Sequence, residues 1–390
     1  MRVCIVSKTS KVDRLTPVSN YKYVGGGGIS THTLALALEG LGHEVLIAGH
    51  PDEIGKGFDV VLHQNTKLLP ETQRKAEELG LPFAVTVNGM ISCPKATHVK
   101  SRDYFGYECR KCSLPGLLHC FATDKDMGYS WFRADENNRA ALLLTALPRY
   151  QLLRARMQAL AKAGQVIPID QILRSTLVEA GVPAERIEVC PQPVSEDFLR
   201  DSGERVFAEK TFVFSGGTQW IKGFEASVWA VERVPKARLA VLGHQVPERV
   251  QWAKKVLGNR VTFPGNIDNR EIGKYFYSAY GALFSSVWFE GYARAFSEPM
   301  MCGTPVIAFP DRGGGDYMEH ERTALVARER SVEAYAEQIK RLVEDEGLRN
   351  RLGRNAREYA VENFSADKVA GRYEKMLKAV ARQGSGKKCR

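Results

Sequence analysis

The chain has 390 residues, of which 44% are hydrophobic and 26% charged, and its 55 Lys and Arg against 45 Asp and Glu give a formal charge of +10. This apolar content excludes a disordered chain, and 8 cysteines spread over this length exclude a small disulfide-stabilised protein. No apolar run approaches the roughly 20 residues that span a bilayer. We therefore expect a soluble, cytoplasmic protein, and two domains, because a single core rarely exceeds about 300 residues.

In the first half, short apolar runs alternate with helix-length segments. The runs that predict strands are 2–8, 45–48, 60–62, 83–87, 165–169 and 186–190. A glycine run at 25–28 lies between a strand and a stretch of helical periodicity that ends at Gly42. We interpret this run as an anion-binding loop, with a flexible turn as the alternative. Helix-like segments are predicted over 137–163. This alternation indicates a parallel sheet with helices on both faces. It lapses over about 89–126, where cysteines and turn residues collect.

The sequence Pro191-Gln192-Pro193 stops any helix and suits a domain boundary. A second α/β series follows, with strands predicted at 211–214, 239–242, 261–263, 281–285 and 306–308 and helices at 331–346 and 366–382. The predicted domains are therefore Rossmann-like units over 1–192 and 193–365. A C-terminal helix from 366 is expected to pack back on the first domain, and a basic tail ends the chain at 390.

The stretch 285–308 predicts a strand, a loop, a helix start and another strand. Ser297 is the expected N-cap, with Glu298 and Pro299 in the first turn. A helix that opens after a parallel strand presents free N–H groups to a phosphate. Glu298 could then accept hydrogen bonds from ribose hydroxyls, with Glu290 at the other end of the ligand. The alternative is that Glu298 only favours the helix dipole.

This stretch resembles the E-x7-E region of family 4 retaining glycosyltransferases, which have the GT-B fold of two Rossmann-like domains facing each other across a cleft. The turn Gly313-Gly314-Gly315-Asp316 is similar to the glycine-rich turn of the family. Three shorter matches, at Gly27-Gly28, at 220–223 and at 263–266, lie earlier in the chain and occur in the order in which the family has them. The residues of the main stretch that keep the family pattern are Glu290, Gly291, Tyr292, Glu298, Met300, Gly303, Pro305 and 306–308.

The resemblance implies transfer of a sugar from a nucleoside diphosphate sugar to an acceptor, with retention of configuration. The acceptor could be a glycan, a lipid-linked sugar or a small molecule. Lys222 would neutralise the leaving phosphates, Glu290 would hold the sugar and Glu298 the ribose, and no catalytic metal is expected. The other donor-binding residues implied are Gly27, Gly28, Gly217, Thr218, Gly265, Asn266, Gly291, Tyr292, Ala293, Arg294 and Ala295.

The chain departs from the family pattern at two places. Gly217-Thr218 stand where the family has an arginine, which Arg294 could replace unless it serves on the surface. Asn88 stands where the family often has a histidine, and an amide can donate a hydrogen bond but cannot act as a base. His63 ends a predicted strand and could face the cleft. The candidate catalytic residues are thus Glu290, Lys222, Asn88 and His63.

Two other functions stay open, a GT-B nucleotide-sugar isomerase or epimerase and a catalytically silent nucleotide-binding protein. The glycine run lacks the G-x-G-x-x-G spacing of a dehydrogenase. Nucleic acid is not an expected partner, because no module interleaves basic and aromatic residues. The tail 387–390 could make a weak peripheral membrane contact, or could simply be solvated.

Four cysteines lie in the segment 89–126, at Cys93, Cys109, Cys112 and Cys120. One C-x2-C pair with two flanking cysteines suits a structural zinc ion bound by four thiolates. An iron–sulfur site with the same ligands and a set of separate buried thiols are the alternatives.

Overall fold

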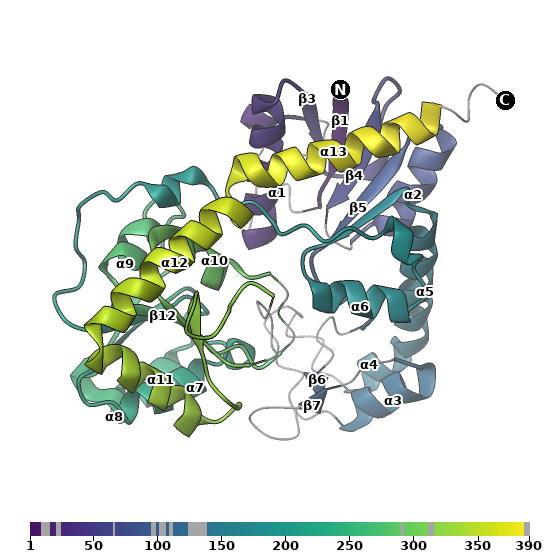
Figure 1. Cartoon of the computed structure of the whole chain (residues 1–390). Helices are drawn as coiled ribbons and strands as arrows, with labels where there is room; N and C mark the ends of the chain where they lie inside the picture. The colour runs from purple at the N-terminus through teal and green to yellow at the C-terminus, as the bar shows by residue number, and fades with distance from the viewer. Residues whose placement is uncertain are drawn as a thin grey trace.

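The computed structural model of the chain describes residues 1–8, 16–20, 25–64, 67–94, 99–100, 107–108, 112–123, 139–288, 290, 292–310 and 316–385. These residues form two lobes, each built on a six-stranded sheet (Figure 1). The strands of both sheets pair in parallel, apart from the short edge strand β2, which runs antiparallel to β3. This confirms the predicted fold class of two Rossmann-like domains.

The sheet of the N-terminal lobe has the strand order β2-β3-β1-β4-β5-β8. All residues of β4 and β5 are buried, because helices cover both faces of a parallel sheet. The run predicted as a strand at 186–190 contributes only a bridge from Ile187 to Val166. The strands are β1 (Arg2–Val6), β2 (Thr16–Pro17), β3 (Glu44–Ala48), β4 (Val60–Gln64), β5 (Phe83–Val87) and β8 (Gln165–Pro168).

Helices cover the two faces of this sheet from different parts of the chain. On one face, α1 (Gly25–Gly40) packs with the C-terminal helix α13 (Ala366–Ser385). On the other face lie α2 (Leu69–Glu78) and α5 (Ala146–Lys162). The helix-like segments predicted over 137–163 are two helices on either side of Thr145. The remaining elements are the pair β6 (Val99–Lys100) and β7 (Tyr107–Glu108), with α3 (Leu114–Thr123), α4 (Arg139–Leu144) and α6 (Gln171–Glu179).

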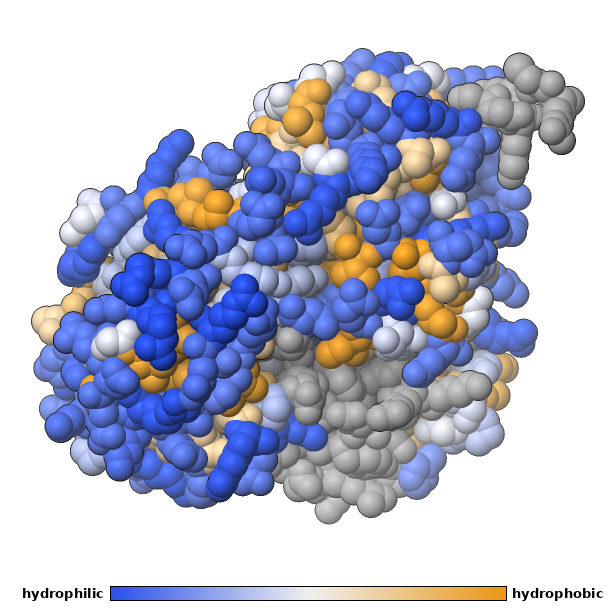
Figure 2. Space-filling view, viewed as in Figure 1, coloured by the Kyte–Doolittle hydropathy of each residue, from blue (hydrophilic) through white to orange (hydrophobic). Residues whose placement is uncertain are grey.

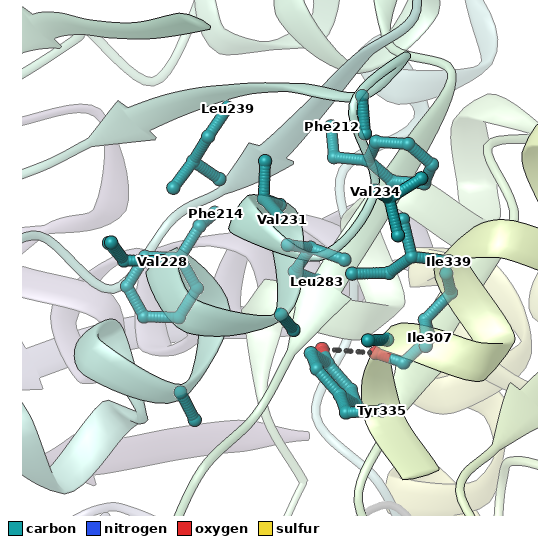
Figure 3. Close-up of a cluster of buried hydrophobic side chains, with 14 of the residues drawn as sticks. Phe212, Phe214, Val228, Val231, Val234, Leu239, Leu283, Ile307, Tyr335 and Ile339 are labelled. Carbon is teal, nitrogen blue, oxygen red and sulfur yellow. Dashed lines mark hydrogen bonds between the residues drawn. The ribbon is translucent and has the colours of Figure 1, made fainter. Parts of the chain in front are cut away.

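The sheet of the C-terminal lobe has the order β11-β10-β9-β12-β13-β14. Its core packs Phe212, Leu239 and Ile339 between sheet and helices, and the Tyr335 hydroxyl donates to the Ile307 carbonyl at 2.9 Å (Figure 3). The strands are β9 (Thr211–Phe214), β10 (Arg238–Leu242), β11 (Val261–Gly265), β12 (Gly281–Phe284), β13 (Val306–Ala308) and β14 (Ala324–Val326). The helices are α7 (Phe224–Glu232), α8 (Pro247–Leu257), α9 (Ile272–Ser278), α10 (Arg294–Cys302), α11 (Val332–Glu344) and α12 (Glu346–Phe364).

The chain crosses between the lobes twice, and the two crossings lie side by side. The Val194 amide donates to the Phe364 carbonyl at 2.8 Å, and Val194 bridges Ser365. Beyond the second crossing, α13 runs along the N-terminal lobe (yellow in Figure 1), where Tyr373 lies 3.1 Å from Thr86. Among the described helices, none combines the length and the hydropathy that a bilayer crossing requires.

Candidate active site

The strand orders define one switch point in each lobe. From β9 the chain adds β10 and β11 on one side, and β12, β13 and β14 on the other. In the other lobe, β3 lies on one side of β1, and β4, β5 and β8 on the opposite side. Ligands bind beyond the carboxyl ends of the strands at such points, because the flanking loops diverge there. The topology therefore points to the loops after β9 and β12 and to the start of α1.

Lys222 and Glu290 follow the two strands at the C-terminal switch point. The Lys222 Nζ and the Glu290 Oε1 form an ion pair, with the side chains 19% and 13% exposed. The Ser286 Oγ lies 2.9 Å from the other carboxylate oxygen, and the Lys222 Nζ lies 5.2 Å from the centre of the Trp288 ring. The cation is thus held in a fixed place at the edge of the sheet, as stabilisation of a leaving phosphate requires.

A close backbone contact supports the turn that carries Lys222. Gly223 has a φ of +85°, and a Cβ at this position would lie 1.8 Å from the Ser285 carbonyl oxygen. The Ser285 hydroxyl donates to the Gly223 carbonyl at 2.9 Å, and the Val287 amide donates to the Ile221 carbonyl at 3.0 Å. Glycine is required here, because any side chain would push the turn, and Lys222 with it, away from β12.

The start of α1 lies next to the start of α10. A Cβ on Gly26 would lie 3.4 Å from the Arg294 Cδ, so the two lobes approach each other at these helix ends. The first amides of a helix have no partner within the helix and attract anions. Gly27 and Gly28 belong to the first turn of α1, which corrects the prediction of a glycine loop before the helix.

The helix that carries Glu298 begins earlier than predicted. α10 starts at Arg294 with Ala293 as its N-cap, so Ser297 is not the N-cap and both Glu298 and Pro299 lie inside the helix. Local residue preferences favour a start at Ser297, since a proline inside a helix removes a backbone hydrogen bond. Packing of the preceding residues overrides that preference.

Glu298 is 4% exposed and forms an ion pair with the Arg294 guanidinium one turn earlier. Burial raises the pKa of Glu298, whereas the Arg294 charge and hydrogen bond lower it. The same guanidinium donates to the Asn269 side chain in the loop after β11. Arg294 is therefore only 20% exposed and lies at the junction of the lobes, which favours a site role over a surface role.

The loop before α10 is held by an aromatic cluster. Tyr292 contacts Phe296, Tyr317 and Phe364 with ring centroids 5.2–5.9 Å apart, and it is buried. Ring pairs of this kind stabilise by about 1 kcal/mol beyond their burial. Of the other residues predicted in this loop, Ala295 is half-buried in the first turn of α10, and Gly291 lies outside the described residues.

The other predicted donor-binding turns flank the same edge of the sheet. Gly217 has a φ of +60° and Thr218 is buried, and the Arg249 guanidinium donates to the Thr218 carbonyl at 2.6 Å. Gly265 ends β11 with a φ of +86°, and Asn266 follows it in an exposed position. Their roles towards a nucleotide stay predictions.

The predicted position of His63 has to be corrected. The side chain is 1% exposed within β4, and the alternation of the strand places it, with Val61, on the face covered by α2 and α5 rather than in the cleft. Burial lowers the pKa of His63 to about 3, and the nearby Arg156 charge acts in the same direction. Asn88, in contrast, follows β5 directly at the carboxyl end of the sheet.

A contact between the lobes, which the sequence did not predict, involves Asp170 and Asp316. Asp170 caps α6 by accepting from the Leu173 amide at 2.7 Å, and the Asp316 carboxylate accepts from the Gln171 amide at 2.7 Å. The Tyr317 hydroxyl donates to the Ile169 carbonyl at 2.5 Å. Burial raises the pKa of Asp170 to about 6, the Asp316 charge adds to this, and backbone amides oppose it. An aspartate between a strand and a helix is the only sequence signal for this contact.

The predicted zinc site cannot be assembled from the described residues. Cys93 and Cys112 are half-buried and Cys120 is buried, and Cys109 lies outside the described part. Cys93 packs against the large cluster between the lobes, whereas Cys112 packs against a small cluster of α3 and α4. Within the described ranges, no three His, Cys, Asp or Glu side chains are grouped so that they could hold a metal ion. Zinc at these cysteines stays a prediction.

Solved structures share this architecture over nearly the whole chain. The structure of HepE from Anabaena in complex with UDP-glucose superposes with a TM-score of 0.70 at 15% identity, covering 97% of this chain and 100% of that one. Sucrose-phosphate synthase from Thermosynechococcus elongatus gives a TM-score of 0.64 at 19% identity, covering 97% and 99%. With the two switch points facing one junction, the protein has the GT-B fold.

Sequence comparisons match the C-terminal lobe to a known family and the chain to several glycosyltransferases. Residues 195–359, within the C-terminal lobe, match the family described as Glycosyl transferases group 1. An uncharacterized glycosyltransferase, MJ1069 of Methanocaldococcus jannaschii, is 23% identical over 55% of this chain. The lipopolysaccharide core biosynthesis glycosyltransferase LpsE of Rhizobium meliloti is 28% identical over 40%. The chain spans only about half the length of these relatives, 58% and 46%.

Proposed function

We propose that the protein transfers a glycosyl group from a nucleoside diphosphate sugar to an acceptor, with retention of configuration. The observation that carries the proposal is the placement of Lys222 and Glu290 at the switch point between β9 and β12, close to where two helices begin. The family match of the same lobe supports it. Related proteins named for transfer of sugars in lipopolysaccharide and capsule biosynthesis favour a glycan or lipid-linked acceptor.

In the proposed reaction the bond between the anomeric carbon and the β-phosphate oxygen breaks, and the acceptor oxygen forms the new bond on the same face of the sugar. Negative charge then develops on the leaving diphosphate. Lys222, Arg294 and the free amides of the first turn of α1 stabilise that charge, and they take the place of a divalent metal. The acceptor proton passes to the leaving phosphate oxygen, since Asn88 is not a base and His63 is enclosed in its lobe.

In this scheme Glu290 changes its contacts when a donor binds. Without a donor its carboxylate neutralises Lys222 and accepts from Ser286. A bound diphosphate competes for Lys222 and frees one carboxylate oxygen for the hydroxyls of the sugar. Glu290→Gln should therefore lower turnover more than it lowers donor affinity.

The proposal is tested by thermal shift with UDP, GDP, ADP and their sugars, followed by an assay for slow hydrolysis of the stabilising donor. UDP and UDP-glucose come first in the panel, because the HepE structures hold them. Lys222→Met is expected to lower donor turnover by roughly 100- to 1,000-fold. Lys255→Met removes the same charge from an exposed position on α8 and should leave turnover unchanged.

Three outcomes decide between the candidate functions. Release of nucleoside diphosphate that depends on Lys222 supports transfer. Interconversion of nucleotide sugars without release supports an isomerase or epimerase, and stabilisation by a nucleotide with neither reaction supports a silent binding protein. EDTA should leave the transferase reaction unchanged, and elemental analysis of protein purified without added metal checks the separate proposal of one zinc ion at Cys93, Cys109, Cys112 and Cys120.

A further inference from the structure

The guanidinium of Arg294 is anchored at one nitrogen by two groups of its own lobe. Its Nη2 contacts the side-chain oxygen of Asn269, in the loop after β11, and the carboxylate of Glu298, one turn further along α10. In the part of the chain that the structure describes, no hydrogen bond engages Nε or Nη1. A guanidinium has five N–H donors, so the anchored group can still donate to a ligand.

The Arg294 side chain lies against the first turn of α1, in the other lobe. A Cβ on Gly26 would lie 3.4 Å from the Arg294 Cδ, and α10 begins on the side of the C-terminal lobe that faces α1 (Figure 1). The start of a helix carries a partial positive charge and N–H groups without a partner in the helix. An anion between the two would accept hydrogen bonds from both, which explains what the open nitrogens of Arg294 are for.

Asn269 stands in a turn that is closed by hydrogen bonds. The Asp268 carbonyl accepts from the amides of Glu271 and Ile272 at 2.9 and 3.1 Å. On either side of the turn, Ile267 and Ile272 pack against the large hydrophobic cluster between the lobes. The turn therefore fixes the place from which the Asn269 side chain reaches Arg294.

We propose that Asn269 is a positioning residue that holds the Arg294 guanidinium toward the diphosphate of the donor. Glu298 alone would draw the guanidinium back along α10, because the carboxylate is 4% exposed and attracts the cation strongly at short range. Asn269 holds the same nitrogen from a different element. A cation that is already in place loses less conformational entropy when the ligand binds. This inference rests on the proposed function, and it adds a residue that acts through Arg294.

The test compares the affinity of the full-length protein for a nucleoside diphosphate with its affinity for the corresponding nucleoside. The diphosphate is the one among UDP, GDP and ADP that stabilises the protein most, and the nucleoside is measured by competition against it. Asn269→Leu removes the oxygen at similar side-chain size and should lower diphosphate affinity by about tenfold, the usual effect of losing a hydrogen bond to a charged group. Nucleoside affinity should stay unchanged, because the nucleoside has no phosphate.

The matched control is Asn350→Leu, because the Asn350 side chain also accepts from an arginine, Arg349, at 3.2 Å. It is exposed on α12, on the largely hydrophilic face of the C-terminal lobe in Figure 2, and the variant should bind both ligands as the wild type does. A second comparison places Asn269→Leu in an Arg294→Gln background, in which an amide donor remains for Glu298. No further loss of diphosphate affinity is expected there, since Asn269 acts through Arg294.

Three results would overturn the inference. Equal losses of diphosphate and nucleoside affinity in Asn269→Leu would show that Asn269 only supports the loop. A further tenfold loss in the Arg294→Gln background would show that Asn269 does not act through Arg294. Unchanged diphosphate affinity in Asn269→Leu, with a loss in Lys222→Met, would reject the role of Asn269 and leave the proposed function standing. If the wild type binds none of the nucleotides, the proposed function fails, and this inference fails with it.

Discussion

At the scale of single residues, Arg294 and Glu298 form an ion pair one turn apart in the first two turns of α10. The sequence resemblance assigns Glu298 to the ribose of a donor, yet the carboxylate is buried and paired within its own helix. Removing one partner of a buried pair leaves the other charge unpaired, which costs about 3 kcal/mol or more. We therefore expect the pair to contribute to the stability of this loop, in addition to any contact that it makes with a ligand.

Arg294→Met is expected to lower the free energy of unfolding by about 3 kcal/mol, because it leaves the Glu298 carboxylate buried and unpaired. The double variant Arg294→Met/Glu298→Met should recover part of that loss, since neither charge remains. Urea unfolding of both single variants and the double variant measures the coupling. Additive effects of the two single substitutions would show that the pair does not contribute.

Asp170 makes the stability of the lobe junction depend on pH. Burial and the Asp316 charge raise the pKa of Asp170 from 3.8 to about 6. Since the folded state binds the proton more tightly, the Asp170 carboxyl costs stability as the pH rises from about 4 to about 6, and the cost stays constant above that. At pH 7 it amounts to at most about 3 kcal/mol.

Asp170→Asn is therefore expected to gain stability relative to the wild type between pH 4 and pH 7, while an amide oxygen can still cap α6. Urea unfolding across this range measures the difference. Asp316→Asn keeps Asp170 but removes the neighbouring charge, so the transition should move to lower pH. Parallel stability profiles of wild type and Asp170→Asn would mean that folding does not raise the pKa of Asp170.

At the scale of elements, a negative charge in the first turn of α1 should stabilise the helix but weaken donor binding. Gly26→Asp adds a negative charge at a helix start, which favours the helix by up to about 1 kcal/mol. The same charge lies next to Arg294 and would compete with a diphosphate for it. We expect an unchanged or higher melting temperature together with at least a tenfold loss of affinity for the stabilising nucleotide.

Gly40→Asp is the matched control for this prediction, because it adds the same charge at the opposite end of α1, where a Cβ meets no atom within 4 Å. It should lower the melting temperature slightly and leave nucleotide affinity unchanged. Isothermal titration measures both variants. Equal affinities of Gly26→Asp and wild type would remove the start of α1 from the binding site.

The sequence predicts best those elements in which every residue is buried. β4 begins with the apolar run 60–62 and β5 is apolar except for Thr86, and both strands are buried throughout. The start of α10 was predicted wrongly because Ser297-Glu298-Pro299 has the composition of a first turn, whereas the aromatic contacts of Phe296 with residues far along the chain fix an earlier start. Packing between distant parts of the chain also buries Glu298 and His63, and no local sequence pattern predicts this burial.

The contact between the lobes was missed for a related reason. Asp170 and Asp316 are 146 positions apart, and only the assembled molecule brings the Asp316 carboxylate to the turn after β8. The hydrophobic packing also depends on both lobes, because Ile169 and Leu173 of one lobe lie in the same hydrophobic cluster as Tyr317 of the other. Sequence patterns report the period of an element, but not which elements meet.

At the scale of the whole molecule, the two lobes are joined by paired crossings and by α13. Helix α13 buries Val369, Tyr373, Met376, Leu377 and Val380 against the sheet of the N-terminal lobe. Each large apolar side chain is worth about 1.5–3 kcal/mol on burial, so their sum is comparable with the stability of a typical domain. The first lobe is therefore completed by the last helix of the chain.

A chain that ends at Ser365 lacks α13 and is expected to leave the N-terminal lobe unfolded, while the core of β9 to β14 stays intact. Hydrogen exchange separates the two lobes: amides of β1 and β4 should lose protection, whereas those of β9 and β12 should keep it. A chain that ends at Ser385 retains the helix and should exchange as the full-length protein does. Protection of β1 and β4 in the shorter chain would show that α13 is attached to a lobe that folds without it, and the five buried side chains would then serve to fix the lobes relative to each other.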